Sequence, residues 1–529
     1  MDKTMMETRN LTQRLLLPSL VCVFGLLLLF NPVLRSGFDT IPGDAADSRL
    51  VNWILEHGFQ WVRGNPLHSK FWSPPIFYPA QNTAAYTDIL LGSGPIYWLF
   101  RFLGAPSETA FQLWEIAVSA LNFLSMAWLL RRFKFQAAPA SIGAFLFAFA
   151  NARAAQLIHP QLLPQFFTPI ALGALIESQR LGRDARLWLI TGMSAAVAQL
   201  YAGFYLGWFL VFLGAVTFTT LLFQKEPRAR LKLWFQTLRL EIAISALLSA
   251  ALLWPMASHY LAASREIGPR PFYDVALMLP RLKSWFFLGE NNLIYGGLAS
   301  WAKYQPEKLP YRSEHTIGLG FATLLLCLTG FVQSRKLPQH RTLIRSAAIV
   351  TLASFLLSLW VGGFSLWRGV FEVFPAGKAI RSVTRLQLGL LLPWAISLAG
   401  LLAYRPKWVI PVLALVAAEQ VSIYPGYSKT QAQARALHLV RRIPPGCPAF
   451  LLAPVSNQRS GPEQQLDAMW ASEIIGKPTL NGHSGSAPPG WGFEAVETAH
   501  LDAKLADWKK ATGFALPPDC VIMQVNPEY

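Results

Sequence analysis

Two aspartates near the start of the chain have the spacing that acid–base chemistry requires. They stand in the run Gly43-Asp44-Ala-Ala-Asp47, shortly after an apolar stretch ends. A helix beginning near Asp44 would place both carboxylates on one face, because residues three apart are neighbours there. A partly buried carboxylate can accept a proton from a hydroxyl, and a second can raise its pKa, position a substrate or help to hold a metal ion. The alternative is a plain helix start, with Asp44 as N-cap and Asp47 in the first turn.

Five further residues are candidates for the same kind of site. Arg381 and Arg385 stand four apart, so on a helix they would share a face and grip a phosphate together. His159 precedes a proline and either contacts a phosphate or is a structural histidine at a helix start. Arg153 is either a phosphate ligand or an anchor at the membrane boundary. Asp88 is either a second acidic group of the site or the N-cap of a following helix.

The composition places these residues in a membrane protein. Charged residues are 14% of the 529 positions and hydrophobic residues 53%, whereas soluble domains carry about 25% charged residues. The net charge of +17 resides in short basic clusters between apolar runs, which is the arrangement that orients a chain in a membrane. Without a nucleic-acid-binding motif, the positive charge does not indicate a nucleic-acid partner.

Eleven apolar runs predict about eleven transmembrane helices. Lys and Arg clusters follow every second run, which predicts a cytoplasmic N-terminus, an uncleaved first span and an outer C-terminal region. With this orientation Arg381 and Arg385 lie on the outer side. The preference of Lys and Arg for the cytoplasmic side therefore does not explain them. The predicted spans are 15–34, 108–130, 139–151, 162–178, 187–200, 204–223, 240–257, 315–333, 346–361, 385–403 and 408–424.

Long segments on the outer side divide the chain into two domains. The transmembrane domain, 1–424, carries outer loops at 35–107, 258–314 and 362–384, the last with a predicted interfacial helix over 364–374. The first loop predicts two helices on the membrane surface, one beginning near Asp44 and one at about 89–103. The tail, 425–529, is richer in Pro, Gly, Gln and Asp and predicts a small α/β domain, with strands at 449–455 and 521–525 and a helix at 462–475.

The four cysteines fall into two groups. Cys22 and Cys327 lie inside apolar runs and are expected to be small buried residues. Cys447 and Cys520 flank the apolar segments of the tail. In an oxidising compartment these two could form a disulfide, and the sequence leaves that question open.

The chain resembles the GT-C superfamily of membrane glycosyltransferases, and more closely a bacterial branch of it without an assigned activity. The resemblance covers most of the chain and rests on the order and spacing of its segments rather than on one specific motif. These segments are 43–57, 77–92, 148–162, 201–205, Arg381-Ser-Val-Thr-Arg385 and Gly476-Lys-Pro-Thr-Leu-Asn-Gly482-His-Ser-Gly.

What the resemblance implies is a transferase of the bacterial inner membrane whose tail is periplasmic. The donor would be a sugar on a polyprenyl phosphate, the acceptor a glycan, lipid or protein on the outer face, and the reaction inverting. Asp44 matches the position of the family's catalytic Asp. Better-studied members often have adjacent acidic residues, whereas two alanines separate Asp44 from Asp47 here. A divalent cation, Mg or Mn, would be held by Asp44, Asp47 and Asp88 if the site uses one.

Two other parts of the sequence have open interpretations. Arg312, Glu314 and His315 cluster before a predicted span, where an ion pair at the membrane boundary is favoured. The run Asn481-Gly482-His483-Ser-Gly485 predicts a loop that either covers the mouth of the site and touches the acceptor or serves as a structural turn.

Two other classes of function fit a chain of this kind. A transporter or flippase for a lipid-linked sugar would be expected to carry charges at mid-membrane and often an internal repeat, and neither stands out in this sequence. A non-catalytic scaffold for envelope assembly would tolerate substitution of its acidic residues. Because a shared fold does not establish activity, substitution of Asp44 is the decisive comparison.

Overall fold

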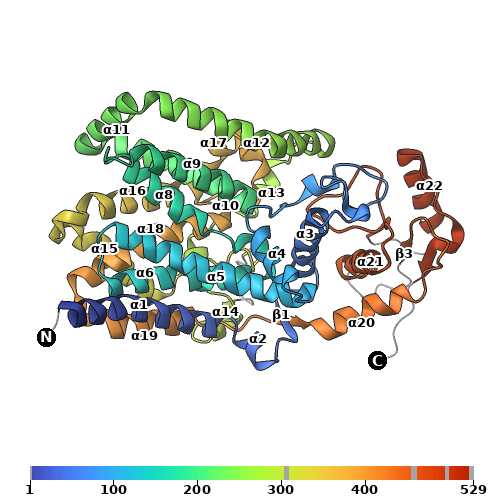
Figure 1. Ribbon diagram of the computed structural model, residues 1–529, viewed down its shortest axis with the longest axis horizontal. Coiled ribbons are helices and arrows are strands. Elements are labelled where there is room, and N and C mark those ends of the chain that lie inside the picture. The colour runs from blue at the N-terminus through green and yellow to red at the C-terminus, as the bar shows by residue number, and fades with distance from the viewer. Residues whose placement is uncertain (1–2, 303–308, 454–460, 495–499, 524–529) are drawn as a thin grey trace.

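The computed structural model is mostly helical, with 68% of it in helices, and describes residues 3–302, 309–453, 461–494 and 500–523. Long helices lie side by side in a bundle, and the C-terminal segment packs against one end of it (Figure 1). Six helical segments are long and apolar enough to cross a membrane, so the chain is a membrane-embedded helical protein. These segments are Ser107–Arg132, Ala137–Ile158, Phe204–Leu222, Arg239–Ile267, Pro338–Ser358 and Val383–Tyr404.

Each of the eleven predicted spans contains a helix. Beyond the six segments above, Leu16–Leu29 and Phe321–Gln333 are apolar but shorter, so the full count of eleven spans stays a prediction. The helices of the bundle are α1 (Lys3–Leu29), α5 (Ser107–Arg132), α6 (Ala137–Phe149), α8 (Phe167–Ser178), α9 (Ala185–Ala202), α10 (Phe204–Leu222), α12 (Arg239–Ile267), α15 (Phe321–Gln333), α16 (Arg341–Ser358), α18 (Leu386–Tyr404) and α19 (Val409–Gln420).

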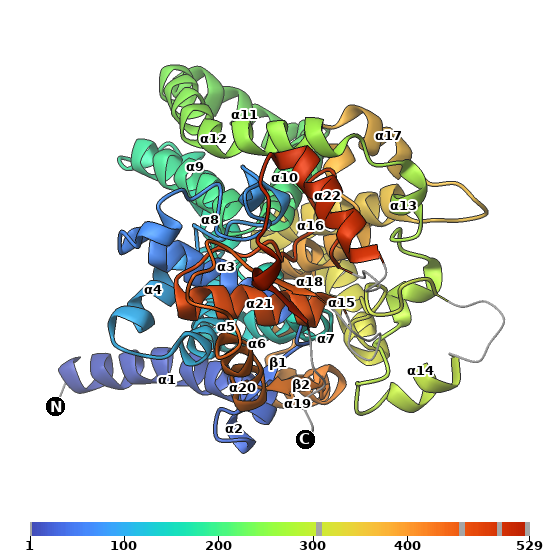
Figure 2. The same cartoon turned by 90° about the vertical axis from the view of Figure 1, so that its right-hand side faces the viewer.

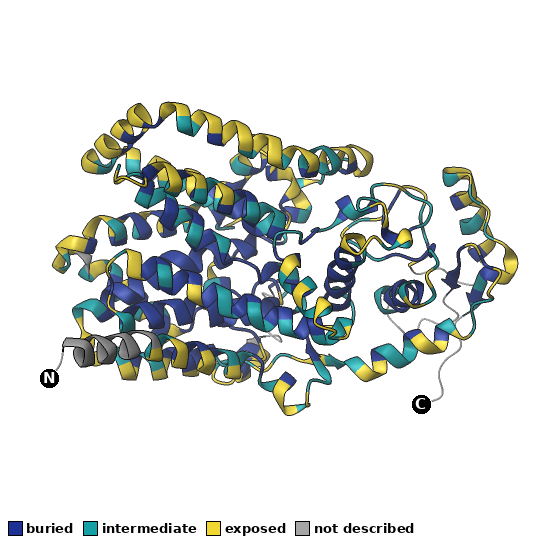
Figure 3. Cartoon of the chain, viewed as in Figure 1, coloured by how far each residue is buried: buried dark blue, intermediate teal, exposed yellow. Residues whose placement is uncertain are grey.

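The bundle is organised around α6 and α18, which are buried along most of their length. A side chain at Gly143 of α6 would lie 2.8 Å from the carbonyl oxygen of Ala395 in α18, so glycine permits this close approach. Helix α12 is the opposite case, because only 11% of its apolar window is buried. Figure 3 shows it exposed along the edge of the bundle. Its exposed Leu247 and Trp254 are suited to contact with lipid.

The segment between α1 and α5, which the sequence predicts as the first outer loop and which is called the first outer segment below, contains α2 (Asn31–Arg35), β1 (Thr40–Pro42), α3 (Asp47–Val62) and α4 (Gly94–Phe102). The sequence predicted α3 as a helix lying on the membrane surface. Instead every residue from Ser48 to Phe59 is buried, because α4, α5 and the tail helix α21 (Gly461–Ile475) pack around it. Its polar side chains therefore need partners inside the protein, and Arg49 forms an ion pair of 2.7 Å with Asp467 of α21.

Short helices occupy the other connections. The predicted interfacial helix at 364–374 is present as the shorter α17. The bounds are α7 (Asn151–Ala154), α11 (Lys225–Thr237), α13 (Phe272–Ala276), α14 (Gly296–Ala302) and α17 (Trp367–Val373).

The tail has the predicted mixture of short strands and helices. Strand β2 (Gly426–Ser428) pairs antiparallel with β1, and β3 (Leu451–Ala453) pairs in parallel with β4 (Val521–Met523). Both predicted tail strands are thus present, although residues 454–455 and 524–525 lie outside the described residues. The helices are α20 (Lys429–Val440), α21, which matches the predicted helix, and α22 (Leu501–Thr512). In the view of Figure 2 these tail helices face the reader.

A disulfide joins Cys447 to Cys520, which answers the question that the sequence left open. It connects the segments before β3 and before β4. Cys22 and Cys327 are free and buried, as expected.

Candidate functional site

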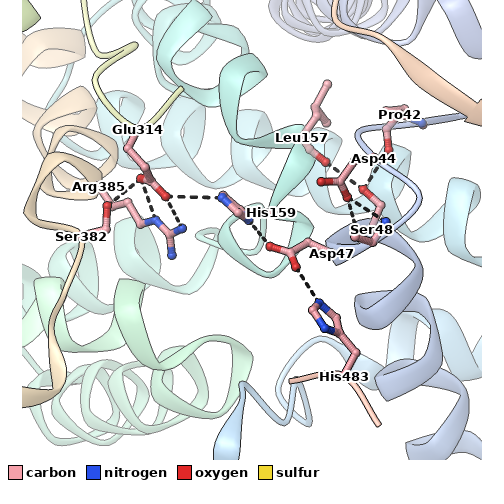
Figure 4. A network of polar contacts seen from close by, with 11 residues as sticks. Pro42, Asp44, Asp47, Ser48, Leu157, His159, Glu314, Ser382, Arg385 and His483 are labelled. Atoms are coloured by element: carbon pink, nitrogen blue, oxygen red, sulfur yellow. Dashed lines mark hydrogen bonds and ion pairs between the residues drawn. The ribbon is translucent and has the colours of Figure 1, made fainter. Parts of the chain in front are cut away.

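The candidate residues gather at the end of the bundle that the tail covers. A continuous chain of polar contacts connects the start of α3, the turn after α7, the segment before α15, the start of α18 and a loop of the tail (Figure 4). All five segments are separated in sequence by helices of the bundle, so only the fold brings their side chains together.

Asp44 lies just before α3 rather than in it, because the helix begins at Asp47. The two aspartates therefore do not share a helix face, contrary to the prediction. Asp44 Oδ1 accepts hydrogen bonds from the backbone N–H groups of Ala46 (3.1 Å) and Ser48 (3.4 Å), so it does cap the first turn from outside. Solvent reaches its side chain.

Gly43 determines how closely this turn approaches the rest of the site. Its φ is +92°, in the left-handed region that favours glycine, and a side chain there would meet the carbonyl oxygen of Leu157 at 2.5 Å. The Ser48 hydroxyl lies between carbonyl oxygens of both segments, 3.0 Å from Pro42 and 3.3 Å from Leu157. The acidic turn is thereby fixed against the turn that carries His159.

Asp47 is bound by two histidines. His159 Nδ1 lies 2.7 Å from Asp47 Oδ2, and His483 Nε2 lies 3.4 Å from Asp47 Oδ1. Each carboxylate oxygen thus faces one imidazole. His159 comes from the turn after α7, and His483 comes from the tail.

The chain of contacts continues from His159 into the bundle. His159 Nε2 lies 3.4 Å from Glu314 Oε1, and Glu314 forms a buried ion pair with Arg385 in which both carboxylate oxygens accept. The Ser382 hydroxyl donates to Glu314 Oε2 at 2.6 Å. The Arg385 guanidinium also lies over the ring of Tyr205, 5.0 Å from its centre. Acidic and basic side chains therefore alternate from Asp47 through His159 and Glu314 to Arg385.

The contacts pull the pKa values of the groups in opposite directions. Burial alone would raise the pKa of Asp47, but the hydrogen bonds from His159 and His483 outweigh it and hold that pKa below its usual value. Burial opposes protonation of His483, yet Asp47 and Glu494 raise its pKa to about 9. The pKa of His159 is also raised, because its bonds to Asp47 and Glu314 overcome the effect of burial.

The pKa of Asp44 is shifted in the opposite direction from that of Asp47. The surrounding protein and the negative charge of Asp47 raise the pKa of Asp44, and hydrogen bonds from backbone N–H groups only partly offset this. Asp44 is thus the more basic and more accessible carboxylate of the two. It can accept a proton, whereas Asp47 is engaged by its histidines.

Asp88 neither caps α4 nor joins the two aspartates directly. Its Oδ1 accepts from the backbone N–H of Phe204, the first residue of α10, at 2.5 Å. It is therefore a cap for a helix that is distant in sequence. Burial raises the pKa of Asp88 to about 6, with the charge of Arg385 acting in the opposite direction. Asp88 also lines a pocket beside His483, together with Trp53 and Thr83 of the first outer segment.

The predicted arginines occupy three different environments. Arg381 precedes the helical region, which begins at Val383, so it shares no helix face with Arg385 and the predicted pairing is wrong. Its side chain is exposed and has no partner among the described residues, whereas Arg385 is bound to Glu314. Arg153 is fully buried, and its guanidinium donates to Gln165 and to backbone carbonyl groups. Arg153 therefore serves the packing and is not free to bind a ligand.

Among the carboxylate and imidazole groups of this network, Glu314 and His483 were not assigned to the site from the sequence. Glu314 stands beside Arg312 and His315, and the expected boundary ion pair among them is not what forms. Arg312 instead pairs with Glu290 at 2.9 Å. His483 lies in the tail loop whose role the sequence left open, and the loop does cover the acidic turn. The signal for Glu314 in the sequence was a charged residue at the start of a predicted span. The signal for His483 was a histidine in a glycine-containing loop.

Asp44, Asp47 and Asp88 are the residues that would hold a divalent cation. In the described part of the chain, no three histidine, cysteine, aspartate or glutamate side chains are arranged to hold a metal ion. Both oxygens of Asp47 face imidazoles, and Asp88 is turned to a helix start, which leaves Asp44 without the oxygen partners that Mg²⁺ prefers. These residues do not fit a divalent cation, so no chemical step is assigned to one.

Comparison with known proteins gives no family for this chain. Neither a protein-family model nor a curated protein matches it.

Proposed function

We propose that the chain is a membrane glycosyltransferase that moves a sugar from a polyprenyl-phosphate donor to an acceptor hydroxyl on the outer face of a bacterial inner membrane. One observation carries the proposal. An accessible aspartate with a raised pKa lies beside a second, ionised aspartate at the end of a membrane bundle, and a chain of contacts leads from there to Arg385, the residue just before α18. An acid–base group beside a cationic one is what transfer between a hydroxyl and a phosphate ester requires.

In the proposed reaction Asp44 accepts the proton of the acceptor hydroxyl. The acceptor oxygen forms a bond to the anomeric carbon of the sugar, and the bond from that carbon to the phosphate oxygen breaks with its electron pair. The configuration is inverted, and polyprenyl phosphate leaves. Asp47 stays ionised and keeps His159 in place, because its pKa is lowered by its two histidine partners.

The departing phosphate is assigned to Arg381 rather than to the predicted group of Arg381, Arg385, His159 and Arg153. Arg381 is exposed, with its backbone N–H 3.0 Å from the hydroxyl of Tyr205, whose ring lies against Arg385. Arg385 contributes to phosphate binding through its positive charge, and it fixes Glu314 through their ion pair. Arg153 is given no part in binding the phosphate, because the packed side chains around it enclose its guanidinium.

The proposal includes the orientation of the chain. All eleven predicted spans cross the membrane, the N-terminus is cytoplasmic and the tail is periplasmic. The disulfide between Cys447 and Cys520 supports an outer tail, because disulfides persist in oxidising compartments and are rare in the cytosol.

The test is complementation of a gene deletion in the host with wild type, Asp44→Asn or Asp502→Asn, with outer-surface glycans and polyprenyl-linked sugars measured by mass spectrometry. Asp44→Asn keeps an acceptor for the Ala46 N–H but loses the base, so the glycan should fall about 10²- to 10⁴-fold while the lipid-linked sugar accumulates. Asp502→Asn makes the same change on the exposed surface of α22 and should restore the wild-type profile.

Membrane levels of each variant are compared by immunoblot. If Asp44→Asn is present at the wild-type level and restores the glycan, Asp44 is only a helix cap. The lipid-linked-sugar transporter and the non-catalytic scaffold then replace the transferase.

A further inference from the structure

A loop of the tail is attached to the first outer segment by backbone hydrogen bonds. The N–H of Phe77 donates to the carbonyl oxygen of Asn481 at 2.9 Å, and the N–H of Tyr78 donates to that of Thr479 at 3.0 Å. In return the N–H of Thr479 donates to Pro75 at 3.0 Å. The tail loop is therefore fixed to the same outer segment that carries Asp44 and Asp47.

The loop is also fixed from the side of the tail. The Asn481 side chain exchanges two hydrogen bonds with the backbone of Leu452 in β3, at 2.7 and 3.0 Å, and donates to Gln465 of α21 at 2.8 Å. Gly482 passes against the ring of Phe77, where any side chain would lie 2.4 Å from a ring carbon. The backbone that carries His483 thus has little freedom to move.

The ring of His483 lies between two carboxylates. Its Nε2 is 3.4 Å from Asp47 Oδ1, its Nδ1 is 3.7 Å from Glu494 Oε1, and its side chain is 14% exposed. Because His159 holds the other oxygen of Asp47 at 2.7 Å, the two histidines fix the carboxylate from opposite sides. One histidine belongs to the bundle and the other to the tail.

We infer that His483 is a positioning residue for Asp47, so that the C-terminal segment completes the acidic site of the first outer segment. The relevance of His483 to sugar transfer rests on the proposed function, whereas its hold on Asp47 does not. Without His483, Asp47 Oδ1 loses its partner and the carboxylate can turn toward Asp44. Two like charges then compete for protons, and Asp44 is no longer distinct as the base.

The contact between His483 and Asp47 is tested on the purified full-length protein by labelling with diethyl pyrocarbonate, followed by peptide mass spectrometry. This reagent reacts with unprotonated imidazole. Near pH 7, His483 should react far more slowly than the exposed His438 of α20. A pKa of about 9 leaves His483 about 1% unprotonated, against about three quarters at the usual pKa. Asp47→Asn should therefore speed the labelling of His483 at least tenfold and leave His438 unchanged. A change below twofold overturns the inference.

The consequence for the site is measured by the complementation described above. His483→Ala should lower the glycan at least tenfold, and His483→Gln, which keeps a hydrogen-bond donor, should restore part of it. Gly482→Val leaves His483 in the sequence but displaces its backbone, so it should resemble His483→Ala. His438→Gln is the matched control and should behave as wild type.

The two proposals fail in different ways. If Asp44→Asn loses the glycan while His483→Ala, present at the wild-type level, restores it fully, the inference about His483 is overturned and the proposed function stands. If Asp44→Asn, present at the wild-type level, restores the glycan, the proposed function is lost. The labelling rates then decide alone whether His483 holds Asp47.

Discussion

The buried ion pair between Glu314 and Arg385 gives a prediction whose size follows from burial. Their side chains are 6% and 8% exposed, and the pair lies where α18 begins. Glu314→Gln would leave the Arg385 guanidinium buried without a counter-charge. Removing one partner of a buried pair costs about 3 to 5 kcal/mol, most of it from the charge left behind. We therefore expect the free energy of unfolding to fall by that amount.

A double-mutant cycle separates the pair from its surroundings. Arg385→Gln should cost a similar amount, and Glu314→Gln/Arg385→Gln should cost clearly less than the sum, because neither charge then remains unpaired. The matched control is the exposed pair of Lys378 and Glu372, 2.8 Å apart and about half exposed, for which about 0 to 1 kcal/mol is expected.

The free energies are measured by titration with SDS in mixed micelles, which unfolds helical membrane proteins. Additive single effects, or a Glu314→Gln variant no less stable than Glu372→Gln, would refute the argument that burial makes this pair energetically strong. The contacts that lead from Asp47 through His159 to Glu314 would then not be anchored to the bundle by a strong ion pair.

Two further predictions concern Asp88 and the disulfide. Because the pKa of Asp88 is raised to about 6, the folded protein keeps a proton between roughly pH 4 and 6 that the unfolded chain releases, so stability falls as the pH rises through that window. Asp88→Asn should remove this fall and raise the Tm at pH 7.5, and a lower Tm there would contradict the assignment. Replacing Cys447 and Cys520 by Ser should destabilise the tail by about 2 to 5 kcal/mol, seen as faster hydrogen exchange in β3 and β4, and a reductant should have no further effect on that variant. Unchanged exchange in those strands would show that packing alone holds the tail.

The sequence predicted those features that depend on local pattern. Apolar runs located a helix in every predicted span, and the shift in composition located the tail with its helix at 462–475. The alternative in which Asp44 caps the first turn of a helix and Asp47 lies in that turn was predicted as well, whereas the shared helix face was not found.

What the sequence could not predict depends on contacts between distant segments. An amphipathic pattern in α3 cannot reveal that α21 will cover its polar face, because the partner of Arg49 stands at Asp467. Glu314 has charged neighbours in sequence, yet its partner is Arg385. Asp88 caps a helix that begins at Phe204. Each error came from assigning a polar group to its nearest neighbours in the chain.

The pairing of the first outer segment with the tail has a consequence for biosynthesis. Arg49 and Asp467 are 418 residues apart, so α3 leaves the ribosome long before α21, whose Asp467 neutralises the charge of Arg49. At about 5 to 20 residues per second, the ribosome takes roughly 20 to 80 s to supply that partner. The acidic turn therefore remains without its cover throughout the insertion of the bundle. The tail then completes the polar network, and we expect a chain truncated before residue 461 to lack the contact between His483 and Asp47.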